Sequence, residues 1–484
     1  MDEEAPEPQI AKARSVTITK KLRQAVFFVY NKRWRPSERK GRADPACKHM
    51  KTFAIATLGC KVNTYESQNY LERLKQAGYA EVDFRDQADI YVINTCSVTN
   101  TAAAKSRQKI HQARRQNPSA LIAVVGCYVQ AADPADVASL QADVIIGAQG
   151  KDQLLERIEN ALAQKQDRPS LAPARSIHVF EALDIHEFSH QTRAFLKIQD
   201  GCNQFCSYCI IPYARGAERS IAPQQAVQIA RTMAERGHQE IVLSGIHTGR
   251  YGRDQGSDLL HLLKQLIAST PAFVRYRISS IEVNEIDDAF IAYMKSEPRI
   301  ARHLHIPIQA ADDEVLRAMN RPYDTAWFAQ RMRFIRSQLP GISISTDMIA
   351  GFPGESEAQF TRALTLVEEE LRFSFIHCFP YSRRDHTKAA AMPNHLPNAV
   401  KKERAARLGA LSARLHRAYM ESFIGKEADV IIEQKKEGML FGHSSEYIPV
   451  YIPWHQDEMP KRMRVHLKAL YRDGMRANET EESS

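Results

Sequence analysis

The sequence predicts an α/β protein built from three folded parts in series. Strand-like and helix-like segments alternate over residues 50–162 and again over residues 191–420, which is the order typical of parallel sheets covered by helices. Short strand-like segments joined by polar turns follow in residues 421–484. A chain of 484 residues also exceeds what one hydrophobic core usually serves, so more than one domain is expected.

Residues 1–49 show no hydrophobic period and are set apart as an extension. They hold 12 Lys and Arg and 6 Asp and Glu, so they supply six of the nine net positive charges of the chain. Two interpretations remain open. The segment is a basic arm, or the protein starts at Met50 and the upstream part is a mis-assigned or dispensable extension, which we favour. Its acidic opening is unlike a secretory signal or a transit peptide.

The region 50–162 is predicted to be an N-terminal domain with a parallel sheet. Each of its first three strands ends in a cysteine, at Cys60, Cys96 and Cys127. Because ligands bind at the carboxyl ends of strands in open α/β sheets, we expect these side chains to converge at one edge. Free cysteines buried in strands are the alternative. The predicted strands are residues 53–59, 88–96, 120–129 and 142–149, and the predicted helices are residues 63–79 and 101–117.

A linker rich in Pro, Ser and Gln is predicted at residues 163–190. The region 191–420 contains six strand-and-helix units, which predicts a TIM-like partial (β/α)6 barrel. It closes with a basic amphipathic helix at residues 396–418, and residues 421–484 predict a small β-barrel. The predicted strands of the larger barrel are residues 194–199, 240–245, 275–281, 303–309, 343–353 and 373–381.

The strongest local signal is the segment GCNQFCSYC. Cys202, Cys206 and Cys209 have C-x3-C-x2-C spacing directly after a predicted strand. Three thiolates on one short loop can hold three irons of a [4Fe–4S] cluster and leave the fourth iron open to a chelating substrate group. A zinc site is the alternative, but zinc motifs usually add a second cysteine pair or histidines nearby.

Composition excludes several classes of protein. No stretch approaches 18 uninterrupted apolar residues, so no membrane span is predicted, and eight cysteines are too few for a disulfide scaffold. Exposed thiolates and clusters persist in reducing compartments, so a cytoplasmic location is expected. The net charge of +9 is only weak evidence for a polyanionic partner.

The C-x3-C-x2-C loop, with Tyr208 before its last cysteine, resembles the signature of radical S-adenosylmethionine (SAM) enzymes. The segments TLGCKVNTYES, INTCSVTNTAAAKSRQ, VVGCYVQ, HLHIPIQAADDEVLRAMNR and STDMIAGFPGES resemble the methylthiotransferase family over roughly residues 51–475. The resemblance implies SAM and two [4Fe–4S] clusters as cofactors. It assigns Cys60, Cys96 and Cys127 to the second cluster, whose open iron holds the sulfur that is transferred.

The resemblance also suggests further contacts. Ser244, Gly245, Glu282, Gln309 and Asp347 are expected near SAM at strand ends, with a role in a turn or a helix cap as the alternative, and Tyr208 is expected near SAM as well. Arg215 and Arg219 are expected to face a phosphate or the SAM carboxylate, with a solvated charge as the alternative. The C-terminal part resembles the RNA-binding TRAM barrel. Its Lys461, Arg462, Arg464 and Lys468 suit backbone phosphates, or form an ordinary solvated basic edge.

The segment LGCKVN around the first cysteine resembles the branch that acts on tRNA N6-threonylcarbamoyladenosine. We therefore predict methylthio transfer to C2 of this nucleoside beside the anticodon, with a reductant such as flavodoxin or ferredoxin and an unidentified sulfur donor as partners. Three alternatives remain open: the same chemistry on isopentenyladenosine, methylthiolation of a ribosomal protein side chain, and a non-catalytic metal-bound RNA-binding protein.

Overall fold

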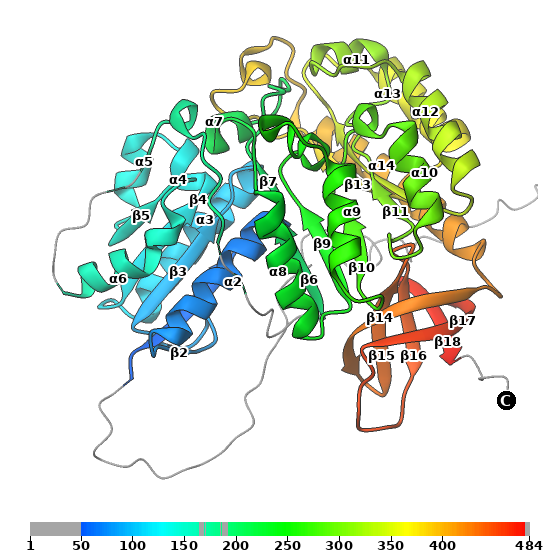
Figure 1. Cartoon of the computed structure of the whole chain (residues 1–484). Helices are drawn as coiled ribbons and strands as arrows, with labels where there is room; N and C mark the ends of the chain where they lie inside the picture. Colours follow the sequence, from blue (N-terminus) through cyan, green and yellow to red (C-terminus); the bar gives the residue numbers. More distant parts are fainter. Residues whose placement is uncertain (1–49, 164–168, 170, 184, 186–191, 480–484) are drawn as a thin grey trace, which may run out of the picture. The chain divides into compact units, whose positions relative to one another are not determined.

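The computed structural model describes residues 50–163, 169, 171–183, 185 and 192–479. The predicted extension at residues 1–49 and much of the predicted linker lie outside the described residues. No helix within the described ranges is both long and apolar enough to cross a bilayer. The α/β class is confirmed, with parallel sheets between Thr52 and Pro380 and a closed barrel at the C-terminus (Figure 1).

The N-terminal sheet has five parallel strands in the order β2-β1-β3-β4-β5. Every residue of β3 and β4 is buried, as expected for strands covered on both faces. Helix α3 packs on one face, and helices α2 and α6 pack on the other. The bounds are β1 Thr52–Thr57, α2 Lys61–Gln76, β2 Ala80–Glu81, β3 Ile90–Thr95, α3 Asn100–Gln116, β4 Leu121–Gly126, α4 Cys127–Ala131, α5 Pro134–Ser139, β5 Val144–Ile146 and α6 Leu154–Leu162.

One local prediction in this sheet is wrong. Residues 127–129 were expected to continue the third strand, but they begin the short helix α4. Gly126 has a φ of +101°, a backbone conformation that ends the extended run and that residues with a Cβ avoid. The strand therefore ends directly before Cys127.

The six predicted strands of the partial barrel are all present and parallel. They form two three-stranded sheets, β6-β9-β10 and β11-β12-β13. One isolated parallel bridge connects the two sheets, where Tyr276 of β10 exchanges hydrogen bonds with Arg299 and Ala301 ahead of β11. The bounds are β6 Arg193–Lys197, β9 Glu240–Ser244, β10 Arg275–Ile278, β11 His303–His305, β12 Ser343–Ala350 and β13 Phe375–Pro380.

Helices follow the barrel strands and cover them from outside (Figure 1). Their starts are readable in the sequence, because Asp258, Asp287, Asp324 and Ser356 each accept a hydrogen bond from a backbone N–H of the first turn. The bounds are α8 Pro223–Glu235, α9 Leu259–Ser269, α10 Asp288–Ser296, α11 Asp313–Ala318, α12 Thr325–Gln338, α13 Glu357–Leu366 and α14 Asn398–Glu421.

The C-terminal strands close into a five-stranded barrel in the order β14-β15-β16-β18-β17. Alternate residues such as Val430 and Ile432 of β14 point into its own apolar core. Arg275 and Arg277 of β10 reach it, because they donate to Asp429 and to the backbone of Ser444. The bounds are β14 Glu427–Lys436, β15 Met439–Ser444, β16 Pro449–Pro453, β17 Arg462–Tyr471 and β18 Gly474–Glu479.

Candidate active site

The first cysteine group lies at the carboxyl edge of the N-terminal sheet. Cys60 follows β1 and precedes α2, Cys96 directly follows β3, and Cys127 follows β4. A Cβ added to Gly59 would stand 2.8 Å from the Cys96 Sγ, so the chain after β1 passes directly over that thiol. Burial and the neighbouring Cys127 and Cys60 raise the pKa of Cys96 to about 12. The structure therefore brings the three predicted cysteines together.

The second cysteine group lies on the loop that follows β7 (Gln199–Asp200). The loop leads into the short helix α7 (Ile211–Arg215), and β8 (Arg219–Ser220) follows this helix. Strands β7 and β8 pair, so the two-stranded ribbon holds the ends of this segment together. Burial and the neighbouring Cys206 raise the pKa of Cys209 to about 12. The Cys202 Sγ lies 3.5 Å from the Nδ1 of His247. All seven cysteines among the described residues are free.

A buried ion-pair network joins the two regions. Glu66 of α2 lies 2.6 Å from the Nζ of Lys151 and 3.2 Å from the guanidinium of Arg215. Asp200 lies 2.7 Å from the Nζ of Lys197 and 3.1 Å from Arg215. We call the following set the buried network, and each member is less than 4% exposed: Glu66, Lys151, Lys197, Asp200, Arg215 and Arg219.

Arg215 connects this network to the first cysteine group. Its Nε donates to the Cys127 Sγ at 3.2 Å, and its Nη2 donates to Asn63 at 2.8 Å. The prediction that Arg215 and Arg219 face a phosphate or the SAM carboxylate, or else solvent, is therefore wrong. Both guanidiniums are enclosed by protein, since Arg219 pairs with Asp200 and donates to the backbone carbonyls of Arg215 and Ala217.

Sequence reasoning missed the other members of the network. Glu66, Lys151, Lys197 and Asp200 lie in segments that read as an amphipathic helix, a turn and a strand, and charged residues there are usually solvated. The available signal was weak: Lys197 stands between the apolar residues Leu196 and Ile198, in a strand whose five residues are all buried. A lysine at such a position needs a buried partner.

The residues predicted to contact SAM lie after the carboxyl ends of the barrel strands. Ser244 ends β9, and its carbonyl accepts from the backbone N–H of Ile198. A Cβ added to the adjacent Gly245 would stand 3.1 Å from Gln199. Gln309 follows β11 in a left-handed conformation with a φ of +68°, and its backbone pairs with β12.

Glu282 follows β10 and is tied to the second cysteine group. Arg321 forms an ion pair with the Glu282 carboxylate and also donates to the Cys206 Sγ at 3.4 Å. Arg321 was not predicted, because its partners come from separate segments. Tyr208 is half-buried against an apolar cluster that includes Leu316.

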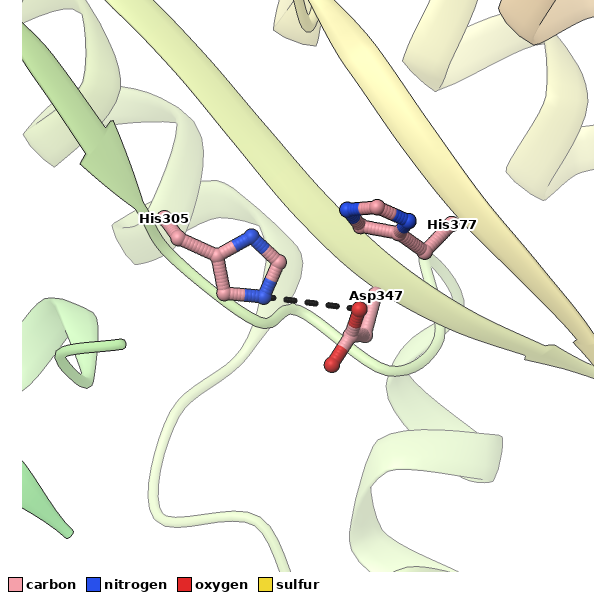
Figure 2. A group of neighbouring side chains, drawn as sticks. All are labelled: His305, Asp347 and His377. Atoms are coloured by element: carbon pink, nitrogen blue, oxygen red, sulfur yellow. Dashed lines mark ion pairs between the residues drawn. The ribbon is translucent and has the colours of Figure 1, made fainter. Parts of the chain in front are cut away.

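Asp347 does not project from a strand end as predicted. It lies in the middle of β12, where its carboxylate is 3.4 Å from the Nε2 of His305 on β11. His377 on β13 is its direct neighbour in the parallel register. Figure 2 shows the His305 ring pointing toward the Asp347 carboxylate, with the His377 ring beside it.

An exposed aromatic pair stands beside the second cysteine group. Phe205 is 51% exposed and Tyr213 is 42% exposed, and their rings meet edge to face with centroids 5.7 Å apart. Phe205 adopts a φ of +48°, which is uncommon for a residue with a large side chain. Tyr213 also lines a surface hollow with Arg383 and Lys388. This surface combines open rings with positive charge.

The predicted basic surface of the C-terminal barrel is only partly free. Arg462 forms an ion pair with Asp429 at 2.5 Å, and the Nζ of Lys461 donates to the backbone carbonyl of Gly237. Arg462 also donates to the backbone carbonyl of Phe273 at 2.7 Å, so Lys461 and Arg462 both help to dock the small barrel on the larger one. The side chains of Arg464 and Lys468 are exposed.

Comparison with known proteins identifies the family. Residues 52–147 match the model of the uncharacterized protein family UPF0004, and residues 196–367 match the radical SAM superfamily. The threonylcarbamoyladenosine tRNA methylthiotransferase MtaB of Bacillus subtilis is 40% identical over 87% of this chain and 95% of its own length. The chain belongs to the radical SAM methylthiotransferase family.

Further relatives are spread over two named activities. The threonylcarbamoyladenosine tRNA methylthiotransferase MtaB of Thermotoga maritima is 37% identical over 82% of this chain and 91% of its own length. A tRNA-2-methylthio-N(6)-dimethylallyladenosine synthase from Novosphingobium aromaticivorans is 35% identical over 85% of this chain and 92% of its own length. The solved radical SAM methyltransferase TsrM from Kitasatospora setae shares the fold, with a TM-score of 0.50 and 12% identity over 69% of this chain and 76% of that one.

Proposed function

We propose that this enzyme adds a methylthio group to C2 of N6-threonylcarbamoyladenosine in tRNA, beside the anticodon, and that it uses two [4Fe–4S] clusters. Cys202, Cys206 and Cys209 would hold the cluster that binds SAM. The other trio, Cys60, Cys96 and Cys127, would hold the auxiliary cluster. The observation that supports two clusters most strongly is the presence of two separate groups of three free cysteines.

The spacing of the thiols favours clusters over single metal ions. A zinc ion with its bonds of about 2.3 Å to sulfur holds tetrahedral thiolates about 3.8 Å apart. Within the described part of the chain, neither cysteine trio has all its sulfurs within 4.8 Å of one another. A cubane cluster bonds each thiolate to a different iron, so it accommodates wider spacing.

The charges around the auxiliary trio also favour a cluster. The buried network holds four cations, Lys151, Lys197, Arg215 and Arg219, against two carboxylates, Glu66 and Asp200, with one further carboxyl group, Glu181, at the Lys151 backbone. Buried charge is costly unless it is compensated. Thiolates that ligate a cluster next to Arg215 would supply the missing negative charge, and the Arg215 Nε already donates to the Cys127 Sγ.

When bound, SAM and the two clusters supply a carbon radical and the transferred sulfur, as in the family that the sequence resembles. The protein's own residues position these groups and exclude water. Arg321 donates to the Cys206 Sγ and holds the carboxylate of Glu282 at the rim of the same loop. We place SAM at the strand ends next to this loop. The residues expected to line its site are Ser244, Gly245, Gln309, Tyr208 and Glu282.

The tRNA would contact two basic surfaces. Phe205 and Tyr213 offer faces on which unstacked bases of an anticodon loop can stack, and Arg383 and Lys388 lie close enough to meet its phosphates. The exposed Lys468 on the C-terminal barrel would meet the RNA backbone. Such a reaction takes place in the cytoplasm, with flavodoxin or ferredoxin as the reductant.

Two experiments test this function. Anaerobically purified enzyme should contain about eight irons and eight sulfides per chain, since two [4Fe–4S] clusters carry that number, and it should cleave SAM on reduction. One zinc and no cleavage would contradict the radical chemistry. Nucleosides from a strain that lacks the gene should then be analysed by mass spectrometry.

The nucleoside analysis separates the candidate substrates. Loss of the methylthio-threonylcarbamoyl nucleoside supports our proposal. If that nucleoside persists and the methylthio-dimethylallyl nucleoside is lost, the substrate is the second one, which relatives at 34–35% identity carry in their names. If both persist, a protein substrate or a non-catalytic role replaces both.

A further inference from the structure

His247 lies in the loop that follows β9 and faces the second cysteine group. Its Nδ1 is 3.5 Å from the Sγ of Cys202, and its Nε2 is 2.9 Å from a carboxylate oxygen of Glu285. The His247 side chain is 7% exposed and the Glu285 side chain is 2% exposed. A buried line of contacts therefore leads from a carboxylate through an imidazole to the first thiol of the C-x3-C-x2-C loop.

The backbone of His247 is fixed to the start of the same cysteine loop. Its N–H donates to the side-chain oxygen of Gln199 at 2.7 Å. The side-chain NH2 of Gln199 donates in turn to the backbone carbonyls of Asp200 and Gly201, directly before Cys202. Because one short segment holds both His247 and Cys202, the fold sets the distance between the ring and the thiol.

The neighbouring sequence leaves room for the carboxylate. A Cβ added to Gly249, two residues after His247, would stand 2.8 Å from the Cβ of Glu285. Real Cβ atoms essentially never come that close, so a larger residue at this position would displace Glu285 from His247. The glycine thus belongs to the arrangement that places the carboxylate behind the ring.

The charges of this line favour a protonated ring. Among the described residues, Glu285 forms an ion pair with His247 and with no other side chain, and its second carboxylate oxygen is buried without a hydrogen-bond partner. A buried carboxylate is costly unless a cation compensates it. A cysteine that ligates iron is a thiolate, so both ring nitrogens then face acceptors. The ring serves both acceptors only as an imidazolium.

We propose that His247, positioned by Glu285, donates a hydrogen bond to the Cys202 sulfur of the SAM cluster and thereby raises the reduction potential of that cluster. This inference rests on the proposed function, because it needs a cluster at Cys202. Hydrogen bonds to the ligating sulfurs are among the features that set cluster potentials. A positively charged donor stabilises the negative charge that reduction adds. SAM cleavage requires the reduced cluster, so a higher potential increases the fraction of enzyme that a given reductant makes competent.

Direct contact with SAM is the alternative role for His247. Ser244 and Gly245, which precede it in the chain, are expected to line the SAM site. Both nitrogens of the His247 ring, however, already lie beside protein atoms, one at Cys202 and one at Glu285. This arrangement favours a role at the sulfur, and contact with SAM becomes an outcome of the test.

The test is an anaerobic redox titration of the holoenzyme, followed by electron paramagnetic resonance. The signal that changes when SAM is added reports the cluster whose open iron binds SAM, and this separates it from the auxiliary cluster. At a fixed ambient potential, His247→Leu should lower the ratio of reduced to oxidised SAM cluster at least tenfold, equivalent to about 59 mV for one electron. Glu285→Gln should lower the ratio less, because the ring stays but loses the carboxylate that keeps it charged. The auxiliary signal should not shift in either variant.

Two controls keep the result specific. His261→Leu removes a histidine from the exposed face of α9, where His261 contacts Gln265, and should keep the wild-type ratio. The affinity for SAM, measured by the same spectral change, should stay at the wild-type value in His247→Leu. Iron content should match wild type in all three variants. If only His247→Leu lost iron, the ratio in Glu285→Gln would decide, and an unshifted ratio there would contradict the inference.

Three results would overturn the proposed role of His247. The first is a wild-type ratio in His247→Leu. The second is weaker SAM binding in His247→Leu without a change in the ratio, which would make His247 a SAM contact. The third is loss of about four irons from both His247→Leu and Glu285→Gln, which would mean that the pair holds the cluster in place instead of setting its potential. Failure of the proposed function is distinguishable, because wild-type enzyme would then show no signal that responds to SAM.

Discussion

Changing Glu66 to Gln removes one negative charge from the centre of the buried network. Glu66 is fully buried and is paired with Lys151, Lys197 and Arg215, at 2.6 Å, 3.4 Å and 3.2 Å. The variant keeps the size of the side chain but leaves four buried cations around one carboxylate. Lys151 loses its ion-pair partner, because Glu66 forms the ion pair that the structure describes for it.

Two estimates of the unfolding free energy lost in Glu66→Gln agree. Breaking a buried ion pair by removing one partner costs about 3–5 kcal/mol. Burial alone would raise the pKa of Glu66, yet Lys151, Arg215 and Lys197 lower it from 4.5 to about 2. A shift of that size corresponds to about 3 kcal/mol of stabilisation at neutral pH. At a urea m-value of about 3 kcal/mol/M, the denaturation midpoint should fall by about 1 M.

The assay is anaerobic urea denaturation of Glu66→Gln beside wild type, with iron counted in the folded protein. Glu368→Gln is the matched control, because Glu368 pairs with Arg414 on the surface and its side chain is 49% exposed. This control should change stability by less than about 0.5 kcal/mol. A Glu66→Gln midpoint within about 0.2 M of wild type would refute the reasoning.

The same carboxylate gives a pH dependence with a definite sign. The folded pKa of Glu66 lies below the unfolded pKa, so its contribution is complete above about pH 4.5 and is lost as the pH falls toward 2. The difference in midpoint between wild type and Glu66→Gln should therefore be constant from pH 7 to pH 5 and should shrink below pH 4.5. A difference that stays constant to pH 3 would show that another interaction is responsible.

Three further variants test the site. Cys127→Ala should retain about four irons, because the auxiliary cluster is lost and the SAM cluster stays. The control variant Cys378→Ala should retain all of the iron. Equal iron in both variants would contradict the assignment of Cys127 to a cluster. Arg321→Leu should slow formation of 5′-deoxyadenosine by about 10- to 100-fold, since a hydrogen bond to a charged group is worth about 1.5–3 kcal/mol. A rate within twofold of wild type would exclude that role. Phe205→Ala should weaken binding of the anticodon stem–loop by about 5- to 150-fold, as expected for one lost stacking contact. Trp327→Ala is its control, because the Trp327 side chain on α12 is 40% exposed, and equal losses in both would argue against a specific stacking surface.

The α/β fold and the two cysteine groups were readable from the sequence because their signals are local. Apolar runs mark β3 and β4, and the N-cap residues Asp258 and Ser356 mark helix starts. Cys60 comes directly after the first predicted strand. Because the carboxyl ends of parallel strands meet at one edge of the sheet, its convergence with the other two cysteines of the trio could be predicted.

The errors arose where long-range packing decides. Arg215 was expected to face a phosphate, the SAM carboxylate or solvent, because nothing near it in sequence shows that Glu66, which is 149 residues away, comes within 3.2 Å. The neighbours of Asp347 could not be read from the sequence, because His305 and His377 belong to other strands. Arg321 became visible only when its contacts with Cys206 and Glu282 were seen.

The sequence by itself determined the chemistry, because thiol spacing on one loop and cysteines at successive strand ends are properties of short segments. The tertiary structure decided which charges are buried, which cations are already paired and which side chains remain for a ligand. Charge pairing depends on segments that meet only after folding, and the energy of a charged group depends on its surroundings more than on its identity. Arg215 shows both sides: the sequence places it shortly after Cys209, and only the fold brings it into contact with Glu66, Asp200 and Cys127.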